Sequence, residues 1–364
     1  MLHVKAPGKL YIAGEYAVTE PGHKAVIIAV DRFISASIDE TTHSKGILHS
    51  RGVHDAPVMF DRHGDRIVLS SKYQETQLQY ITTAIEVVEQ YVVNCGGTVR
   101  HFQLELDSHL ADETGRKYGL GSSAAVIVAV VKALNAFYDM QLSRLELYKL
   151  AVMANIKLQQ LSSCGDIAAS VYSGWIAYST FDHEWLVAQM EMHDVAEVMH
   201  MAWPELYIES LDVPHQLDVL IGWTGSPASS DYLVREVKRI KSDEKRYNAF
   251  LESSQTCVEA LIDCFKEEDI EGIKSNIHRN RRVLQMLDAA TRVDIETPQL
   301  KTLIDIANTY GAAAKTSGAG GGDCGIALVD DDTSRTHIYN EWQANGIKPL
   351  PFHIYQETAL FTFE

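Results

Sequence analysis

Hydrophobic positions near the start of the chain alternate in the way that predicts β-strands. Residues 2–6 and 33–38 both repeat with a period of two, so each is a predicted strand. Over residues 78–92 the apolar positions recur at steps of three and four, which predicts an amphipathic helix. Residues 123–138 are apolar on nearly every side, which predicts a helix that is buried all round.

The rest of the chain continues to mix the two patterns. Further helices are predicted at 143–159, 231–265, 268–290, 298–310 and 333–344. Further strands are predicted at 103–107, 171–180, 217–223, 325–329 and 351–355. Hairpin-like alternation in both halves favours an α+β fold over a doubly wound parallel sheet. Residues 182–215 fit neither period, so we place a domain junction there and divide the chain into 1–190 and 191–364.

Length and composition narrow the class of protein. A chain of 364 residues suggests about two domains, because a domain usually takes roughly 100–200 residues. Hydrophobic residues at 46% and charged residues at 22% exclude a disordered, collagen-like or small disulfide-stapled chain. The longest apolar run, residues 124–131, is far shorter than the roughly 20 residues that cross a bilayer, so we expect no membrane span.

The charge argues against polyanionic partners. The 32 basic and 49 acidic side chains leave a net charge of −17, which makes the chain a poor binder of nucleic acid or of an anionic membrane surface. An anionic ligand would therefore need a local pocket of Lys, Arg and backbone N–H groups. Five cysteines without paired spacing, and no signal-like apolar start, predict a cytoplasmic protein. We predict no obligate protein partner.

Three glycine-rich segments carry the candidate chemistry. In residues 6–18, Gly8 lets the chain turn beside a ligand, and Lys9 adds a compact positive charge. In residues 117–125, glycines and serines open the buried helix with free N–H groups, a positive dipole end and hydroxyls, as a polyphosphate site requires. Residues 315–325 include five glycines within eight positions, which indicates close backbone approach to a ligand or partner chain.

Each segment also has a simpler interpretation. The first is compatible with a strand, a turn and a strand that carry a surface lysine. The second is compatible with a serine N-cap after a turn, and the third with a flexible linker, although apolar strands flank it closely. The Lys315-Thr316 pair is not a P-loop, because Ala314 stands where that motif requires glycine.

In this order and at these separations, the three segments together resemble the GHMP kinase superfamily, named for galactokinase, homoserine kinase, mevalonate kinase and phosphomevalonate kinase. The resemblance covers nearly the whole chain. It implies an N-terminal domain like the second domain of ribosomal protein S5 and a ferredoxin-like C-terminal domain. It also implies phosphoryl transfer that depends on ATP and Mg²⁺, with ATP and acceptor bound in the cleft between the domains.

Details of the motifs are most similar to bacterial members that phosphorylate (R)-5-phosphomevalonate to its 5-diphosphate. Tyr16 stands where members that phosphorylate mevalonate usually have His, and Asp323 stands where they usually have Gly. Residues 164–170 and 221–230 also resemble the phosphomevalonate-specific group. Residues 159–163 depart from the family by being poorer in glycine, which bears on the shape of that loop.

Transfer to a phosphate acceptor depends mostly on positioning and charge neutralisation. Such an acceptor is largely dianionic at neutral pH, because its second pKa is about 6, so it needs shielding more than a base. The resemblance implies that Lys9 and Lys117 supply this shielding. It implies that Asp166 orients the groups first and acts as a base second, while a helix N-cap is the simpler alternative for Asp166.

The resemblance also implies which residues bind the ligands. The ATP phosphates are expected against Gly119, Leu120, Gly121, Ser122, Ser123, Ala124 and Ala125. Ser123 is the expected Mg²⁺ ligand, and Gln159 stands where many relatives have a metal-binding Glu, which implies loosely held metal. Loops 224–230 and 316–322 are expected on the acceptor side. The substrate-binding candidates are Gly8, Tyr16, Ala17, Ser226, Arg281, Arg282, Ser317, Gly318, Ala319 and Gly320. Arg281 and Arg282 are equally compatible with solvated helix charges.

Three alternatives stay open at this point. A mevalonate kinase differs only in having a hydroxyl as acceptor. A sensor protein on the same fold would lack catalysis, although Lys9, Ser123 and Asp166 argue against it. A structural protein with glycine loops for assembly would leave the lysines unexplained.

Overall fold

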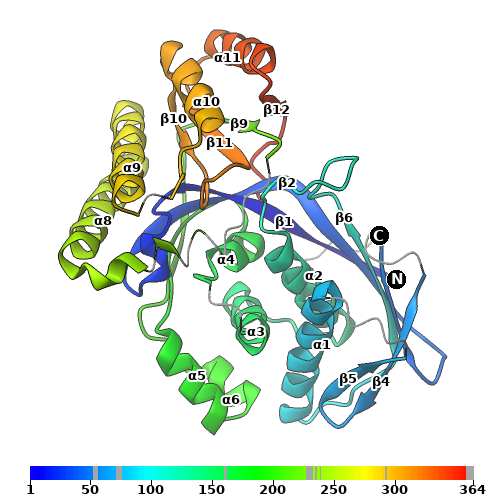
Figure 1. Ribbon diagram of the computed structural model, residues 1–364. Coiled ribbons are helices and arrows are strands. Elements are labelled where there is room, and N and C mark those ends of the chain that lie inside the picture. The colour runs from blue at the N-terminus through cyan, green and yellow to red at the C-terminus, as the bar shows by residue number, and fades with distance from the viewer. Residues whose placement is uncertain are drawn as a thin grey trace.

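The computed structural model describes residues 1–357, except 52–55, 71–75, 160, 161, 227–232, 234, 235, 238 and 292. Two sheets organise these residues (Figure 1). The strands of the first sheet are β1 (Leu2–Ala13), β2 (Lys24–Glu40), β3 (Gly46–Ser50), β4 (Val58–His63), β5 (Arg66–Leu69), β6 (Phe102–Ser108), β7 (Trp175–Ser179) and β8 (Tyr207–Leu211). Their order is β5-β4-β3-β6-β2-β7-β8, with β1 paired to β2. The β3–β6 pair is parallel and the other pairs of this sheet are antiparallel.

Helices cover one side of the long β1–β2 pair (Figure 1). They are α1 (Thr76–Asn94), α2 (Ser122–Phe137), α3 (Arg144–Lys157) and α4 (Gly165–Tyr172), followed by α5 (His183–Met192) and α6 (Val195–His200). Helices α2 and α4 both pack against β1 and β2. The side chains of α2 are buried from Ala124 onward with few exceptions, because the helix lies between the sheet and its neighbours α1 and α3. No helix in the described part of the chain has the length and apolar character needed to span a membrane.

The second sheet contains β9 (Asp218–Trp223), β10 (Ala313–Thr316), β11 (Cys324–Val329) and β12 (Lys348–Leu350), in the antiparallel order β10-β11-β9-β12. Helices α10 (Pro298–Thr309) and α11 (Asp332–Ala344) cover one face, where Leu220 and Ala327 share an apolar cluster with Trp342. On the other face Ile221 and Ile326 join the core of the first sheet. The strands therefore alternate between two apolar layers, as a half-buried period-two pattern requires.

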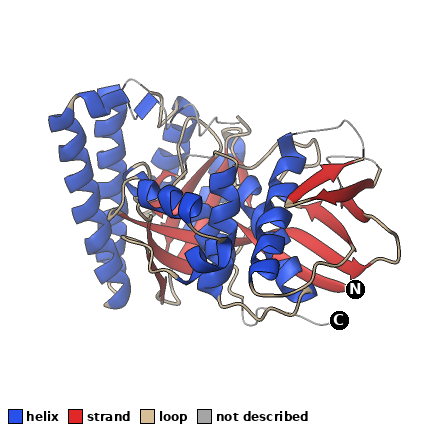
Figure 2. Cartoon of the chain, turned by 90° about the horizontal axis from the view of Figure 1, so that it is seen from below, coloured by secondary structure: helices blue, strands red, loops and turns tan. Residues whose placement is uncertain are grey.

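A long helical pair flanks both sheets. It consists of α8 (Glu244–Lys266) and α9 (Ile270–Thr291), preceded by the short turn η2 (Arg239–Ser242), and stands out along one side of the molecule (Figure 2). Apolar side chains of α8 pack with Tyr16 and Ala17, which lie at the short turn η1 (Ala17–Thr19) of the first unit. The pair therefore connects the segment after β1 with the second sheet.

The structure confirms the predicted α+β class, and the long periodic segments become helices close to their predicted bounds. The strand predicted at 171–180 is shorter, because α4 runs to Tyr172 and β7 begins at Trp175. Residues 315 and 316 belong to β10, although the sequence places them in a glycine-rich loop. The start of the helix predicted at 231–265 lies partly outside the described residues, and α8 begins at Glu244.

The division at residues 190 and 191 stays a prediction, but the two sheets separate later than that. Residue 190 lies within α5, and β8 at 207–211 still pairs with β7 of the first sheet. The second sheet begins with β9 at Asp218. Residues 353–357 then cross back to the first unit, where Ile354 bridges Val30.

Candidate active site

One strand and the N-terminal ends of two helices meet at a single point. Lys9 lies on β1, Gly121 immediately precedes α2, and Asp166 is the second residue of α4. A Cβ atom added at Gly121 would lie 3.1 Å from Cε of Lys9 and 3.4 Å from Cβ of Asp166. The φ of Gly121 is 73°, a conformation that also favours glycine. The structure thus brings Lys9, Asp166 and the start of α2 together, although Asp166 lies outside the three glycine-rich segments.

Neither N-cap residue of these two helices supplies a side-chain cap, although in α4 the N–H of Gly165 donates to Oγ of Ser163 at 3.3 Å. The N-cap residues Gly121 of α2 and Cys164 of α4 make no side-chain capping hydrogen bond. Elsewhere, Ser143 caps α3 and Asp182 caps α5 in the usual way. The first N–H groups of a helix carry partial positive charge, so uncapped ends suit an anion. This end of α2 therefore fits a phosphate group, with Ser122 and Ser123 half-buried in its first turn.

The charges at this point are coupled. Burial raises the pKa of Asp166, and the neighbouring Lys9 ammonium partly offsets that rise. Oδ1 of Asp166 accepts a hydrogen bond from the backbone N–H of Ile167 at 3.0 Å. Nζ of Lys9 lies 3.5 Å from the carbonyl oxygen of Gly119 and 5.3 Å from the ring centre of Tyr11. Lys9 thus lies between the Asp166 carboxylate and the loop that leads into α2.

Tyr11 is a neighbour of this site that the sequence analysis missed. Its hydroxyl lies 3.0 Å from Oγ of Ser163, and a Cβ atom at Gly165 would lie 2.7 Å from it. Burial and the nearby Asp166 charge raise the pKa of Tyr11, so its hydroxyl stays protonated. Its position two residues after Lys9 on one strand places it on the same face, which is the signal that could have identified it.

Direct contacts join the first glycine-rich segment to the third. Lys315, which is 0% exposed, pairs with the buried carboxylate of Glu15. Oγ of Ser317 donates a hydrogen bond to the carbonyl oxygen of Tyr11 at 2.8 Å. The hydroxyl of Tyr16 donates one to the carbonyl oxygen of Ala319 at 2.5 Å. Tyr16, Ala17 and Ser317 are therefore engaged with the protein itself and shape the site, while Gly8 packs against Leu110 and Leu120. The Glu15–Lys315 pair joins residues far apart in the chain and was not predicted from the sequence.

Asp323 joins the third segment to the second. A Cβ atom at Gly119 would lie 2.6 Å from Oδ2 of Asp323, so glycine is needed there for the close approach. The backbone of Asp323 donates to Ser226 at 2.8 Å and accepts from Oγ1 of Thr224 at 3.1 Å. This places Ser226 beside the glycine loop, and its place on the acceptor side stays a prediction. Residues 227–230 of the predicted loop 224–230 lie outside the described residues.

The backbone of Gly320 lies close to another part of the protein, at Ile295. Its φ is 69°, and a Cβ atom would lie 2.2 Å from the carbonyl oxygen of Ile295. Gly321 donates its N–H to the same oxygen at 2.9 Å. Gly318 differs, because its φ is 75° but nothing lies within 4 Å of its added Cβ atom. Of these glycines, Gly318 therefore has open space beside it.

This contrast gives a matched pair of substitutions. Both Gly318→Ala and Gly320→Ala place a side chain in the left-handed region, which costs about 1–2 kcal/mol. Gly320→Ala must in addition displace the backbone at Ile295. We expect Gly320→Ala to lower the thermal midpoint clearly more than Gly318→Ala, as measured by circular dichroism. Equal midpoints for the two variants would contradict the packing of Gly320 against Ile295.

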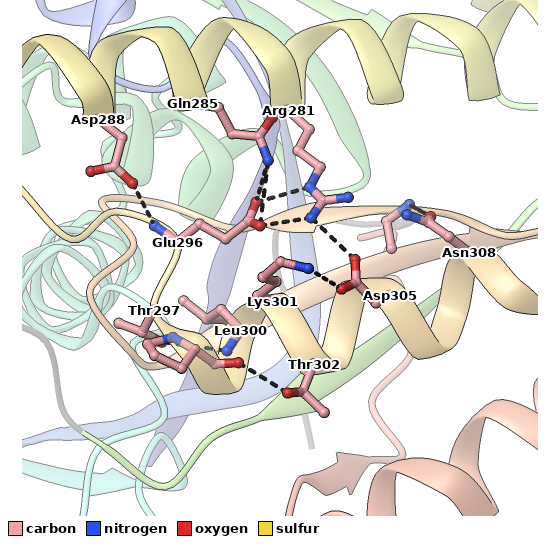
Figure 3. Close-up of polar contacts among 12 residues, drawn as sticks. Arg281, Gln285, Asp288, Glu296, Thr297, Leu300, Lys301, Thr302, Asp305 and Asn308 are labelled. Carbon is pink, nitrogen blue, oxygen red and sulfur yellow. Dashed lines mark hydrogen bonds and ion pairs between the residues drawn. The ribbon is translucent and has the colours of Figure 1, made fainter.

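The guanidinium of Arg281 is paired with carboxylates (Figure 3). Its guanidinium donates to both carboxylate oxygens of Glu296, at 2.8 and 2.6 Å, and reaches Asp305 on α10 at 3.4 Å. A bidentate Arg–carboxylate pair uses the same donors that would bind a phosphate. In this structure those donors are taken by carboxylates, and the binding of the acceptor phosphate by Arg281 stays a prediction. Arg282 is exposed on the same helix, and its role stays a prediction.

Replacing Arg281 should affect stability and leave catalysis nearly unchanged. Arg281→Met removes charged hydrogen bonds worth about 1.5–3 kcal/mol each and leaves the buried Glu296 with the long 3.4 Å contacts from Gln285. We expect a lower thermal midpoint, with KM for the acceptor within about twofold of the unaltered protein. A steep rise in KM with an unchanged midpoint would support the substrate-binding role.

Two further candidates are less closely tied to the site. Lys117 is exposed in the turn before α2, where it forms a bridge with Ala111. Gln159 is exposed after α3, beside residues 160 and 161, which are outside the described part of the chain. Among the described residues, no group of three or more His, Cys, Asp and Glu side chains could hold a metal ion. The roles predicted for Lys117 and Gln159 stay predictions.

Comparison with known proteins agrees with this geometry. The chain matches the N-terminal domain of GHMP kinases over residues 79–174 and the C-terminal domain over residues 261–348. It is 37% identical over 356 residues to a phosphomevalonate kinase of Streptomyces sp. strain CL190, covering 95% of each chain. It is 28% identical over 343 residues to a mevalonate kinase of Pyrococcus abyssi, covering 89% of this chain and 87% of the relative.

A solved structure extends the similarity to the fold. The phosphomevalonate kinase of Streptococcus pneumoniae, in complex with phosphomevalonate and AMPPNP, superimposes with a TM-score of 0.86 at 31% identity. The match covers 98% of this chain and 100% of that one. Both family domains are thus present, and the similarity to the first relative extends over nearly the full length of this chain. The three glycine-rich segments of the chain lie together in one site. The chain belongs to the GHMP kinase family.

Proposed function

We propose that this chain transfers the γ-phosphoryl group of ATP to the phosphate of (R)-5-phosphomevalonate, giving ADP and (R)-5-diphosphomevalonate. The observation that carries the proposal is the convergence of Lys9 and Asp166 on the uncapped N-terminus of α2. A cation and a helix terminus there would face the transferred group, and a carboxylate would hold the cation in place. The 37% identity to a phosphomevalonate kinase over 95% of the chain supports the choice of acceptor.

The charge of each group determines the role that we propose for it. The backbone N–H groups of residues 119–125 would hold the triphosphate of ATP, since the start of α2 has no side-chain cap. Lys9 would screen the two anionic reactants from each other and stabilise charge on the transferred phosphoryl group. Asp166 would keep the Lys9 ammonium in position. Because an acceptor phosphate is already ionised above a pH of about 6, a general base is not required.

Mg²⁺ is expected with the nucleotide. The described residues contain no acidic cluster that would form a metal cage, which suits an ion that keeps several waters and binds mainly to phosphates. The hydroxyl of Ser123, in the first turn of α2, would be the protein ligand. Mg²⁺ supplies charge neutralisation on the phosphates when it is bound.

Mevalonate kinase remains the second candidate, because a mevalonate kinase of Pyrococcus abyssi is 28% identical to this chain. A coupled assay of ADP release, with phosphomevalonate, mevalonate and homoserine offered separately, distinguishes the acceptors. We expect kcat/KM for phosphomevalonate to exceed that for the other two by at least about a hundredfold, because a site built for an accepting phosphate leaves its charges unpaired when the accepting group is a neutral hydroxyl. Preference for mevalonate would replace this proposal with the second candidate.

A further inference from the structure

The last described residues of the chain return from the second sheet to the first unit. We refer to residues 353–357 as the C-terminal strap. The N–H of Tyr355 donates to the carbonyl oxygen of Ala29 at 3.0 Å, and its own carbonyl oxygen accepts from the N–H of Gly174 at 2.7 Å. The strap thereby lies alongside β2 and the connection between α4 and β7.

Glu357 anchors the strap in the interior of the protein. Its carboxylate lies 2.9 and 3.1 Å from Nζ of Lys132 on α2, and the two residues are 9% and 1% exposed. Its backbone N–H donates to Oγ of the buried Ser173 at 2.8 Å, and its carbonyl oxygen accepts from Arg144 at 3.2 Å. Nζ of Lys132 also donates to the carbonyl oxygen of Lys5 at 3.3 Å.

These partners lie on the elements that carry the site. Lys132 is on α2, whose first turn would hold the triphosphate. Ser173 ends α4, whose second residue is Asp166. Lys5 is on β1, four residues before Lys9. Glu357 therefore connects three elements at their ends away from the site, and each element continues as one helix or strand to the site.

We propose that Glu357 is a positioning residue for phosphoryl transfer, acting through Lys132, Ser173 and Lys5 on the helices and the strand that carry the catalytic groups. This inference rests on the proposed function. An unpaired cation in the interior is strongly unfavourable, so loss of the Glu357 carboxylate would drive Lys132 and α2 toward solvent. A helix transmits such a movement along its length, and Lys132 is ten residues from Ser122, or about 15 Å. Displacements of about 1 Å at a reacting group can lower the rate about a hundredfold.

The test compares Glu357→Ala and Glu357→Gln with Glu89→Gln, a control at another buried ion pair that is matched to the second variant. Glu89 on α1 binds Arg62 at 2.6 and 2.7 Å and is also largely buried, but it contacts neither Lys132, Ser173 nor Lys5. We expect Glu357→Ala to lower kcat at least tenfold, with KM for ATP within about threefold. Glu89→Gln should keep kcat within twofold, although its thermal midpoint falls. Glu357→Gln keeps an oxygen for Lys132, so it should fold more readily and lose less activity.

Hydrogen exchange supplies a readout that does not depend on activity. In Glu357→Ala, or in Glu357→Gln if the first variant fails to fold, amides of residues 165–174 should exchange at least about fivefold faster than in Glu89→Gln. Equal exchange in the two variants, or an equal loss of kcat at matched loss of midpoint, would overturn the positioning role. An unaltered protein without kinase activity would refute the proposed function instead, and the exchange rates would still decide whether the strap holds α4.

Discussion

Lys9→Met is expected to lower kcat by roughly 10²–10⁴-fold, the usual scale for a group that stabilises charge in a transition state. The physical reason is the position of Lys9 beside both Gly121 and Asp166, at the uncapped end of α2. Methionine fills similar space without the charge. The thermal midpoint should barely fall, because the hydrogen bond of Lys9 to Gly119 is long, at 3.5 Å, and within the described part of the chain Lys9 forms no ion pair shorter than 4.0 Å.

Lys5→Met is the matched control, because it makes the same substitution at another lysine of β1. The Lys5 side chain is exposed and lies over the ring of Phe33, away from Asp166. Steady-state kinetics of both variants with phosphomevalonate would measure the difference. A Lys9→Met protein with near-full activity, or one no slower than Lys5→Met, would refute the role of Lys9.

Asp166→Asn is expected to lower kcat by about 10²–10⁴-fold and to stabilise the protein at neutral pH. The loss of activity follows from losing the carboxylate that holds Lys9. The gain in stability follows from the raised pKa of Asp166, which means that the folded protein holds the ionised carboxylate at a cost. We expect the free energy of unfolding to rise by about 0.5–2 kcal/mol, as is common when a strained active-site group is replaced.

The size of this effect depends on pH. A carboxyl group whose pKa is higher in the folded protein than in the unfolded chain stabilises the fold most below the unfolded value of about 3.9. That stabilisation is lost as the pH rises through the raised pKa. The advantage of Asp166→Asn should therefore be largest at pH 7–8 and shrink toward pH 4. Denaturant unfolding at both pH values measures it, and a variant less stable than the unaltered protein at pH 7.5 would contradict the burial cost of Asp166.

The pH dependence of the rate separates orientation from base catalysis. If Asp166 only orients Lys9, the residual kcat/KM of Asp166→Asn should rise with the second ionisation of phosphomevalonate, near pH 6, and level off above it. If Asp166 is a general base, the unaltered enzyme should show a carboxylate limb that the variant lacks. Profiles from about pH 5 to 9 for both proteins decide the order of the two roles.

Much of the fold could be predicted because its periodic segments are long. The all-round apolar run at 123–138 can only be a buried helix, and the structure places α2 between the sheet and two neighbouring helices. Short elements were harder to predict from the sequence. The strands β8 and β10 have five and four residues and lie near prolines or glycines. β8 pairs with β7 across α5 and α6, so it has no local partner, whereas β10 pairs with the next strand, β11, across a glycine-rich segment that shows no period-two pattern.

The site could be predicted as a set of segments but not as a set of contacts. Glycines at 119 and 121 mark close approaches that the structure contains, to Asp323 and to Lys9 with Asp166. The partners of Arg281 could not be predicted, because Glu296 and Asp305 become its neighbours only when α10 packs beside α9 (Figure 3). The Glu15–Lys315 and Lys132–Glu357 pairs join residues that lie 300 and 225 positions apart.

The central claim is transfer of a phosphoryl group from ATP to a phosphate. Phosphorus NMR of a reaction containing ATP, Mg²⁺ and phosphomevalonate follows both substrates and both products in one sample. We predict that the monoester signal of phosphomevalonate disappears in step with ATP, and that a new diphosphate and ADP appear in equal amounts. ADP accompanied only by inorganic phosphate, with phosphomevalonate unchanged, would contradict the account.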